Sequence, residues 1–464
     1  MIRIILASAS ALALAACAVG PDYRRPATPQ AAAGAFVTTT PAVTATATDN
    51  DNWWQLYRDP VLDGLIADAL AANTDIRVAV ARLARARASL RETRGDRQPQ
   101  ASAGASATYG RLSAIQRPPG AAREDWTIDT GLDVAYEVDL FGRISRNVEA
   151  ARGDVGAAQA DVDAVRVAVV ADTTRAYADA ASAAERLAVA TRIVALLDRS
   201  LRVTQARARV GLTTGLDTAR IAALRNQRQA DVPALAAQRQ AALLRLATLT
   251  GRTPSELPPI AAARTATLRL AQPIPVGDGA ALLARRPDVR AAERRLAAAT
   301  ARIGVATADL YPRISLGGSI GSTGTGLGNV FGAGPLNWLL GPLISWNVNP
   351  AKARARIAGA EADGQAALAT FDGVVLTALQ ETEVALSNYA RALDRRTALQ
   401  AARDQAEVAA RITRAQQREG QIDSLAQLDA ERTSADAEAA LALADAQIAL
   451  QQIDLFRALG GGWS

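Results

Sequence analysis

The residue types that usually carry enzyme chemistry are almost absent from this sequence. Its 464 residues include no histidine and a single cysteine, Cys17. Without histidine there is no imidazole acid–base catalyst, no histidine metal ligand and no Ser-His-Asp or Cys-His constellation. One cysteine also excludes an internal disulfide and a cysteine-rich zinc site. The sequence therefore predicts a protein that is not an enzyme and needs no cofactor or metal.

The charged residues are mixed in sign along the chain. Lys+Arg number 52 and Asp+Glu number 46, a net charge of +6, and Lys352 is the only lysine. Surfaces that bind phosphate backbones usually cluster their basic residues. This distribution argues against nucleic acid as a partner.

Cys17 lies where lipid could be attached to it. A short positive start is followed by an apolar run, residues 4–14, that is too short to span a membrane and is typical of a secretory signal. Small residues before the cysteine resemble the lipobox of bacterial lipoproteins, which implies cleavage after residue 16 and acylation of Cys17. The alternative is an ordinary signal with an incidental cysteine. Ala18, in place of a retaining aspartate, implies the outer membrane by the same resemblance.

The composition and internal repetition of the chain predict its organisation. Residues 17–58 are rich in Ala, Thr and Pro and are expected to form a loose lipidated tether after the signal peptide, residues 1–16. Asn73–Ala79 resembles Arg286–Ala292, which lies 213 residues later, and further matches lie 209 residues apart. We therefore divide the rest into two repeats, 59–270 and 271–464.

Apolar residues at helical spacing, with little Gly or Pro, predict six helices. They cover residues 60–97, 144–208, 217–250, 286–310, 352–417 and 424–458. About 65 residues at 1.5 Å each give a helix on the order of 100 Å long, too long for a globular domain. A soluble coiled coil and the wall of a helical tube both fit this pattern, the latter because alanine lets helices pack closely. Pro233 is expected to interrupt its helix.

Strict alternation of apolar and polar residues predicts four strands. Residues 126–140 alternate completely, and residues 101–112, 314–320 and 338–346 alternate in part, with Pro342 expected to mark a bulge or bend. A soluble sandwich and an outer-membrane barrel are both consistent with this pattern. Secretion, the lipid anchor and aromatic residues near the strand ends favour the barrel. Its wet face would place Asp129, Asp133 and Glu137 along the pore, where they would favour cations. The alternative is that part of this face lies below the bilayer, since a barrel strand needs only about 9–11 residues to span it.

The strand count constrains the assembly. Four strands cannot close a barrel, and eight strands from two chains would leave an interior filled by side chains. Three chains supply twelve strands, an even number with room for water. A C₃ homotrimer is the simplest open-pore solution.

Seven segments of the sequence resemble the TolC-type outer-membrane factors, most closely the lipoprotein branch typified by OprM and NodT. They are Cys17–Tyr23, Trp53–Trp54, Asp59–Asp63, Tyr136–Arg143, Arg285–Glu293, Tyr311–Leu316 and Ala458–Trp463. The resemblance covers nearly the whole mature chain. It implies an α+β membrane protein: a trimeric 12-strand outer-membrane β-barrel, with four strands per chain, continued by a long periplasmic α-helical barrel. It also implies a passive exit duct served by a periplasmic adaptor protein and an inner-membrane transporter.

The same resemblance assigns roles to residues near the helical turns. The family's gate motif corresponds to Leu425, Asp429 and Arg432, which share one helix face because they lie four and three residues apart. Three copies of Asp429 would form a carboxylate ring. A solvated helix face is the plainer interpretation of these three residues.

The turns between the long helices are the expected adaptor contacts. The residues concerned are Gly211, Leu212, Gly215 and Gly420. Glycine lets a helix end and present its backbone groups, so ordinary turn chemistry explains these residues equally well. Arg286 and Asp288 are expected to serve a helix start.

Two rival classes remain. A secreted coiled-coil scaffold would contain no strands and would need no detergent. An enzyme would need a polar constellation that the sequence does not contain. The cargo is not specified by the sequence.

Overall fold

The structure is a computed structural model in which the chain divides into two compact units, each assembled from both halves of the sequence. It describes residues 18–27, 30–46, 52–111, 113, 115, 119–120, 122–270, 272–325 and 336–461. The first unit comprises Met1–Pro26, Arg82–Gln159 and Ala291–Asp372, and the second comprises Ala27–Ala81, Ala160–Arg290 and Gly373–Ser464. Cys17 lies outside the described residues.

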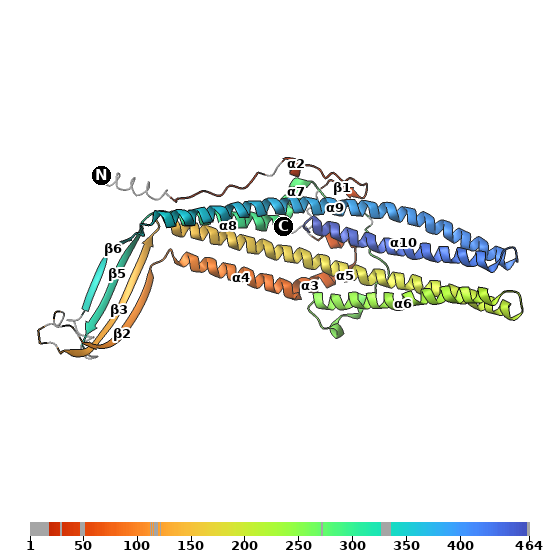
Figure 1. The fold of residues 1–464 in the computed structure, drawn as a ribbon, viewed down its shortest axis with the longest axis horizontal. Helices are drawn as coiled ribbons and strands as arrows, with labels where there is room; N and C mark the ends of the chain where they lie inside the picture. Colours follow the sequence, from red (N-terminus) through yellow and green to blue (C-terminus); the bar gives the residue numbers. More distant parts are fainter. Residues whose placement is uncertain are drawn as a thin grey trace. The chain divides into compact units, whose positions relative to one another are not determined.

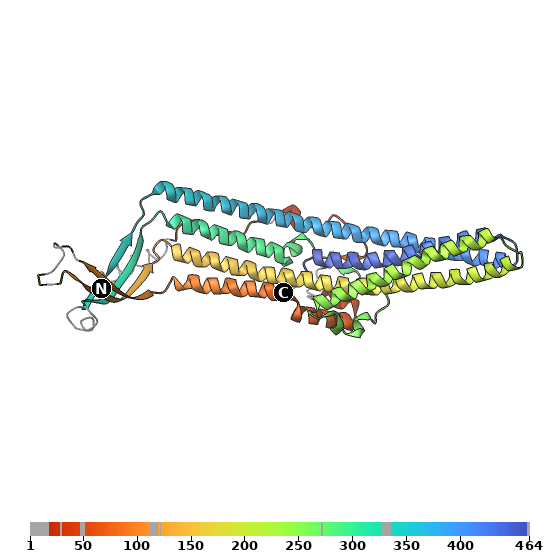
Figure 2. The ribbon, with the colours of Figure 1, turned by 60° about the horizontal axis from the view of Figure 1, so that its bottom comes forward.

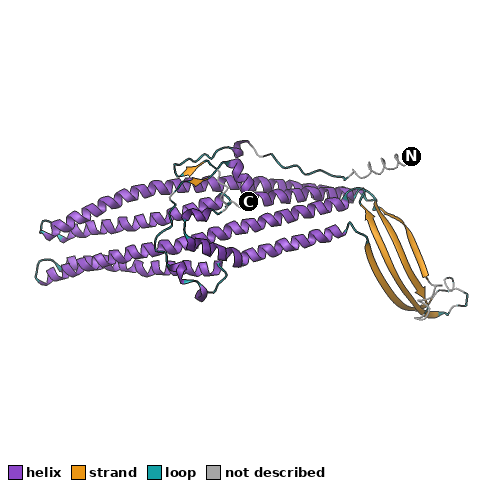
Figure 3. Ribbon diagram, turned by 180° about the vertical axis from the view of Figure 1, so that it is seen from behind, coloured by secondary structure: helices purple, strands orange, loops and turns teal. Residues whose placement is uncertain are grey.

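The first unit contains a four-stranded antiparallel sheet, drawn in orange in Figure 3. Its strands are β2 (Gln100–Arg111), β3 (Glu124–Val138), β5 (Arg313–Gly324) and β6 (Leu336–Ser345), in the order β2-β3-β5-β6. These are the four strands that the alternation predicts. β2 and β6 lie at the two edges of this sheet.

In β3 and β5 the register collects most apolar side chains on one face of the sheet and most polar ones on the other. β6 departs from this pattern, since Leu339 and Leu343 lie opposite Ser319 and Ser315 on the second face. Leu132 pairs with Ile320, which pairs with Trp338. All three are well exposed, and Trp338 retains 74% of its accessible surface. Successive strand residues point to opposite faces, so the polar residues between them share the second face. An exposed apolar face of this size indicates that something apolar covers it.

The expected bulge at Pro342 is wrong. Pro342 pairs with Leu316 in an unbroken register that runs from Leu336 to Ser345. A proline is tolerated because β6 is an edge strand of this sheet, where a missing N–H need not cost a ladder hydrogen bond.

Two pairs of long helices form hairpins, visible in Figures 1 and 2. α5 (Arg143–Arg209) is followed by α6 (Gly215–Leu249), and α9 (Pro350–Arg418) by α10 (Ser424–Ala458). α5 and α9 contain 67 and 69 residues and contribute to both units. α6 continues through Pro233, so the expected interruption there is wrong.

The shorter helices are divided more finely than the sequence pattern predicts. Residues 60–97 form α3 (Pro60–Ala72) and α4 (Thr74–Gly95), separated by Asn73 in an extended conformation. The buried Asn73 amide explains the break, because its oxygen accepts from the Asp75 N–H at 2.9 Å and its nitrogen donates to the Leu249 carbonyl at 3.0 Å. In the second half, α7 (Gly279–Arg285) and α8 (Pro287–Ala308) are separated by Arg286.

The main core lies in the second unit. It surrounds the short helix η1 (Trp53–Tyr57), where Trp53 stacks on Phe456 with ring centroids 4.5 Å apart. Short segments cover this core: α2 (Gln30–Ala33), η2 (Pro254–Glu256), η3 (Pro259–Ala262) and the parallel strand pair β1 (Val43–Thr44) and β4 (Ile274–Pro275). Burial of large aromatic side chains stabilises this region most.

The N-terminal segment is not a loose tether where the structure describes it. In the first unit, the Val19 N–H donates to the Phe141 carbonyl at 3.2 Å, and Gly20 lies directly against the backbone of Gly304. In the second unit, β1 pairs with β4. Backbone pairing and close glycine contact, which composition does not reveal, hold this segment in place.

None of the helices in the described part of the chain is long and apolar enough to cross a membrane.

Candidate functional site

The polar face of the sheet contains the three carboxylates expected to line a pore. Asp129, Asp133 and Glu137 lie four residues apart on β3 and therefore point to the same face. Hydroxyl residues flank the first two across the sheet. Asp129 lies opposite Ser106 and Thr323, and Asp133 lies opposite Ser102 and Ser319.

The three carboxylates are not equivalent. Both oxygens of Glu137 accept hydrogen bonds from Arg143, at 2.8 and 2.7 Å, in a bidentate pair. The hydrogen bond to Glu137 raises the pKa of Arg143 above its ordinary value. Within the described residues, Asp129 and Asp133 have no such cation partner. Two of the three predicted residues therefore present uncompensated negative charge.

The four expected adaptor-contact residues lie in or beside the two helical turns. Gly211 and Gly420 have φ values of 76° and 73°, in the left-handed region that favours glycine. Leu212 donates its N–H to the Arg207 carbonyl at 2.9 Å, and Gln421 donates to Gln416 at 2.9 Å. This is the Schellman pattern that ends a helix.

The first turn also displays an apolar side chain and a helix cap. Leu212 is 74% exposed. Gly215 opens α6 behind Thr214, whose hydroxyl accepts from the Asp217 N–H at 3.2 Å while Asp217 accepts from the Thr214 N–H at 3.1 Å. The Asp217 carboxylate also accepts from the Thr214 hydroxyl at 2.8 Å, and this bond, with the one from the Thr214 N–H, holds the pKa of Asp217 below its usual value. The capping box fixes the start of α6 and leaves Leu212 available for contact.

The expected gate residues lie on the exposed face of α10. Leu425 is 47% exposed and Asp429 is exposed as well. The Asp429 carboxylate makes no hydrogen bond or ion pair with any side chain in the described residues. Arg432 lies 3.8 Å from Asp436 of the same helix. One protomer thus presents the three side chains together but provides them with no partner that could close an aperture.

Residues beside the gate motif fasten α10 to its neighbours. Glu431 accepts a hydrogen bond from the Ser200 hydroxyl of α5 at 2.9 Å and lies 3.9 Å from Arg414 of α9. Arg228 of α6 pairs with Asp436 of α10. The sequence pattern predicts none of these three contacts, since only the fold brings these residues together.

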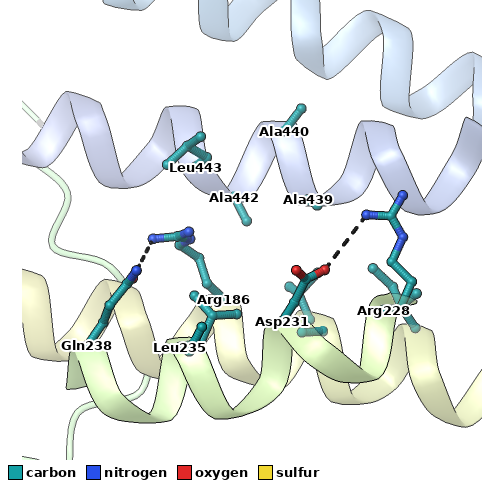
Figure 4. Close-up of a pocket in the computed structure, with 13 residues that line it drawn as sticks. Arg186, Arg228, Asp231, Leu235, Gln238, Ala439, Ala440, Ala442 and Leu443 are labelled. Carbon is teal, nitrogen blue, oxygen red and sulfur yellow. Dashed lines mark hydrogen bonds and ion pairs between the residues drawn. The ribbon is translucent and has the colours of Figure 1, made fainter. Parts of the chain in front are cut away.

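A pocket of about 380 Å³ lies between α5, α6 and α10 (Figure 4). Its floor includes Leu235 and Ala442, and Arg228 lies 3.8 Å from Asp231 at one side. Arg186 donates to Gln238 at 3.3 Å at the other side. The pocket is apolar at its centre and charged at its rim, as a side-chain docking groove would be.

One buried charge, Asp59, was not predicted as a structural anchor. Asp59 is only 6% exposed; it caps α3 through the Val61 N–H at 3.0 Å and accepts from Arg264 at 2.8 Å and Tyr177 at 3.0 Å. Burial and the Asp59 charge raise the pKa of Tyr177, which keeps its hydroxyl a donor. The DP motif in the sequence is the signal for this cap.

Arg286 does more than start a helix. It donates to Asp288 at 2.6 Å, to Glu381 at 2.7 Å and to the carbonyl of Ala458 at 2.9 Å, at the end of α10. Burial lowers the pKa of Arg286, but its bonds and charge interactions with Asp288 and Glu381 outweigh this and raise it. A cation at the C-terminal carbonyls also favours the helix dipole.

Comparison with known proteins shows the family to which the chain belongs. The chain matches the outer membrane efflux protein family over residues 65–252 and 280–461. It is 31% identical to the outer membrane protein OprJ of Pseudomonas aeruginosa over 464 residues, which covers 98% of this chain and 94% of OprJ. The chain therefore belongs to the outer membrane efflux protein family.

Solved structures agree with this assignment. The outer-membrane channel OprN superimposes with a TM-score of 0.87 at 37% identity, covering 96% of this chain and 100% of OprN. The open state of the MtrE outer membrane channel of Neisseria gonorrhoeae gives 0.83 at 28% identity, covering 96% and 98%. The protein is an outer-membrane efflux channel, and the expected resemblance and location are confirmed.

Proposed function

We propose that three copies of the chain form a passive exit duct for solutes that an inner-membrane transporter delivers through a periplasmic adaptor. The four-stranded sheet with one exposed apolar face carries this proposal. β2 and β6 present unpaired edges, and pairing β6 of one copy with β2 of the next would remove them all in a closed ring. Three copies give a 12-strand barrel with its apolar face towards lipid and its Asp129 and Asp133 face towards water.

The helices would continue this barrel as a periplasmic α-helical barrel. The two repeats, 59–270 and 271–464, supply equivalent parts. Asn73 and Arg286 break their helices with the same φ of −60° and with ψ of 134° and 122°. The paired glycine turns, with nearly equal φ, support the same repeat.

The N-terminal segment supports lipid attachment at Cys17. Val19 is held against Phe141, only three residues beyond the end of β3 at Val138. A lipid on Cys17 would then enter the membrane beside the sheet, where acyl chains add about 0.8 kcal/mol per buried CH₂. Mass spectrometry of the N-terminal peptide tests this. We expect acylation that Cys17→Ser abolishes, and an unmodified wild-type thiol would contradict it.

The gate is proposed at Leu425, Asp429 and Arg432. In a trimer, three exposed Asp429 carboxylates would face one another, and Arg432 would pair with a neighbouring copy. The turns at Gly211, Leu212, Gly215 and Gly420 would contact the adaptor. Their exposure and fixed backbone support this role, because a rigid, exposed turn loses little entropy on binding.

Single-channel conductance in planar bilayers tests the duct and its gate. Asp429→Ala with Arg432→Ala should raise conductance, and less so at high salt, because exposed ion pairs contribute about 0–1 kcal/mol each and are screened. Arg220→Ala is the matched control, since Arg220 occupies the corresponding position of the first hairpin and should matter less. Unchanged conductance in an intact trimer would place the constriction elsewhere. A wild-type protein that never conducts would contradict the duct itself.

A further inference from the structure

The tip of the first helical hairpin carries a basic surface that the second hairpin lacks. Residues 199–220 contain five arginines and one acidic residue, Asp217. The corresponding residues 408–429, at the offset of 209, contain three arginines and three acidic residues. The two tips have nearly the same backbone but different charge. This difference therefore reflects what each tip contacts rather than how it folds.

Most of this charge lies on the last three turns of α5. We call the surface the α5 tip face; it consists of Arg199, Arg202, Val203, Arg207, Arg209 and Val210. Within the described residues, none of its four arginines pairs with an acidic side chain. By contrast, Arg225 nearby is paired with Asp198 at 2.9 Å. Four unpaired guanidinium groups so close together repel one another, and an anionic partner would relieve this repulsion.

An apolar stripe runs through the α5 tip face. Leu196, Val203 and Val210 lie seven residues apart and are 43%, 52% and 70% exposed. The packed face of α5 is a different one, where Ile193 and Leu197 are buried. A stripe with a period of seven residues supplies one of the two apolar positions of the heptad with which one helix packs along another. Leu196 lines a pocket together with Ala410 of α9 and Ser434 of α10, whereas Val203 and Val210 lie beyond that pocket.

The charges border the stripe on both sides. Arg202 and Arg209 lie along one edge of the stripe and Arg207 along the other, from their positions around the helix at 100° per residue. Helix pairs commonly match charges at such flanking positions, and this matching selects the partner. A helix with an apolar seam and acidic flanks fits this surface, whereas one with basic flanks would be repelled.

We propose that the α5 tip face binds an amphipathic helix whose apolar seam is flanked by glutamate and aspartate. This inference rests on the proposed function, in which that helix belongs to the adaptor. The inference specifies that the partner helix is acidic and that it binds the first helical hairpin rather than the second. At the offset of 209, the stripe residues Leu196, Val203 and Val210 correspond to Gln405, Ile412 and Glu419 of the second hairpin. That surface therefore keeps one apolar residue of the stripe, Ile412, which is 49% exposed, and it lacks the surplus of arginine. It should discriminate little between acidic and basic helices.

A pair of designed peptides tests this proposal on the full-length protein in detergent. Both are helices of about four heptads with one Leu/Val seam, flanked by glutamate in one peptide and by lysine in its twin. Fluorescence anisotropy should show the acidic peptide binding at least about tenfold more tightly, with the preference falling as salt rises. Arg202→Gln with Arg209→Gln should remove most of this preference. Arg411→Gln with Arg418→Gln, the corresponding change on α9, is the matched control and should leave it intact.

Three results would overturn the proposal. The twins could bind equally, or the α9 variant could lose the preference as fully as the α5 variant. Alternatively, the α5 variant could fail to form trimers, which would assign this face to a second copy of the chain. Conductance of the same variants distinguishes failure of the α5 tip face proposal from failure of the proposed exit duct. Lost or absent peptide preference in a conducting channel would refute the α5 tip face alone.

Discussion

The pairing of Glu137 with Arg143 leads to an unusual prediction about ion selectivity. Asp129→Asn with Asp133→Asn should weaken cation preference, since it removes uncompensated charge. Glu137→Gln should weaken it too, because it exposes the Arg143 guanidinium. Arg143→Gln should strengthen it, because it frees the Glu137 carboxylate. The last two changes act on one ion pair, bonded at 2.8 and 2.7 Å, and should act in opposite directions.

The expected size follows from Coulomb's law. One charge about 8 Å from an ion interacts by roughly 0.5 kcal/mol in water, and screening over one Debye length reduces this to about 0.2 kcal/mol. A ring of three in the proposed trimer then contributes about 0.6 kcal/mol, a factor of about three for a cation, with an opposite factor for an anion. The permeability ratio of K⁺ to Cl⁻ should therefore change by about three- to tenfold per ring.

Reversal potentials across a KCl gradient measure this ratio. The experiment needs trimers of each variant at equal yield. Glu124→Gln controls for a general loss of charge, because Glu124 is an exposed carboxylate on the opposite face of β3. If Glu137→Gln and Arg143→Gln shift the ratio in the same direction, the pair does not compensate itself within the pore. If the Asp129 and Asp133 double variant leaves the ratio unchanged, this face does not line the ion path.

Three further predictions concern stability. Asp59→Ala should destabilise the second unit by about 3 kcal/mol, because it leaves the buried Tyr177 hydroxyl without an acceptor, unpairs the partly exposed Arg264 and uncaps α3. Asp59→Asn, which keeps the cap, should cost less, and thermal unfolding followed by circular dichroism compares the two variants. Asp217 has a lowered pKa, so its cap should stabilise the start of α6 above about pH 4 and lose this effect as pH falls through the lowered value. Hydrogen–deuterium exchange should show this loss in the wild type but not in Asp217→Asn. Gly20→Ala would place a Cβ atom 2.4 Å from backbone of α8 at a φ of 92°, and should expose the bond after Arg24 to trypsin.

Periodicity predicts the long helices and the four strands of the large sheet. Complete alternation over residues 126–140 and long apolar spacing without Gly or Pro leave few alternatives, so β3, α5 and α9 lie where the pattern places them. The positions at which helices end or continue are harder to predict. Asn73 ends α3 because its amide reaches the Leu249 carbonyl, which lies 176 residues away in the sequence. Pro233 remains inside α6 because tertiary packing can outweigh a local preference.

In the candidate site, too, the sequence pattern predicts some features and only the fold reveals others. Alternation places Asp129, Asp133 and Glu137 on one face, but it cannot show that Arg143, beyond the end of the strand, turns back to neutralise one of them. Likewise, the motif around Arg286 identifies a helix start, whereas its bonds to Glu381 and Ala458 depend on the fold. Local patterns predict which face a residue occupies, and the fold decides which partner it meets there.

The mass of the intact complex tests the central claim most directly. Native mass spectrometry of the protein purified from outer membranes should show three copies of the acylated mature chain, as twelve strands in a closed barrel require. A stable monomer that stays soluble without detergent would contradict the account. A dimer would contradict it equally, since eight strands would leave no open lumen for export.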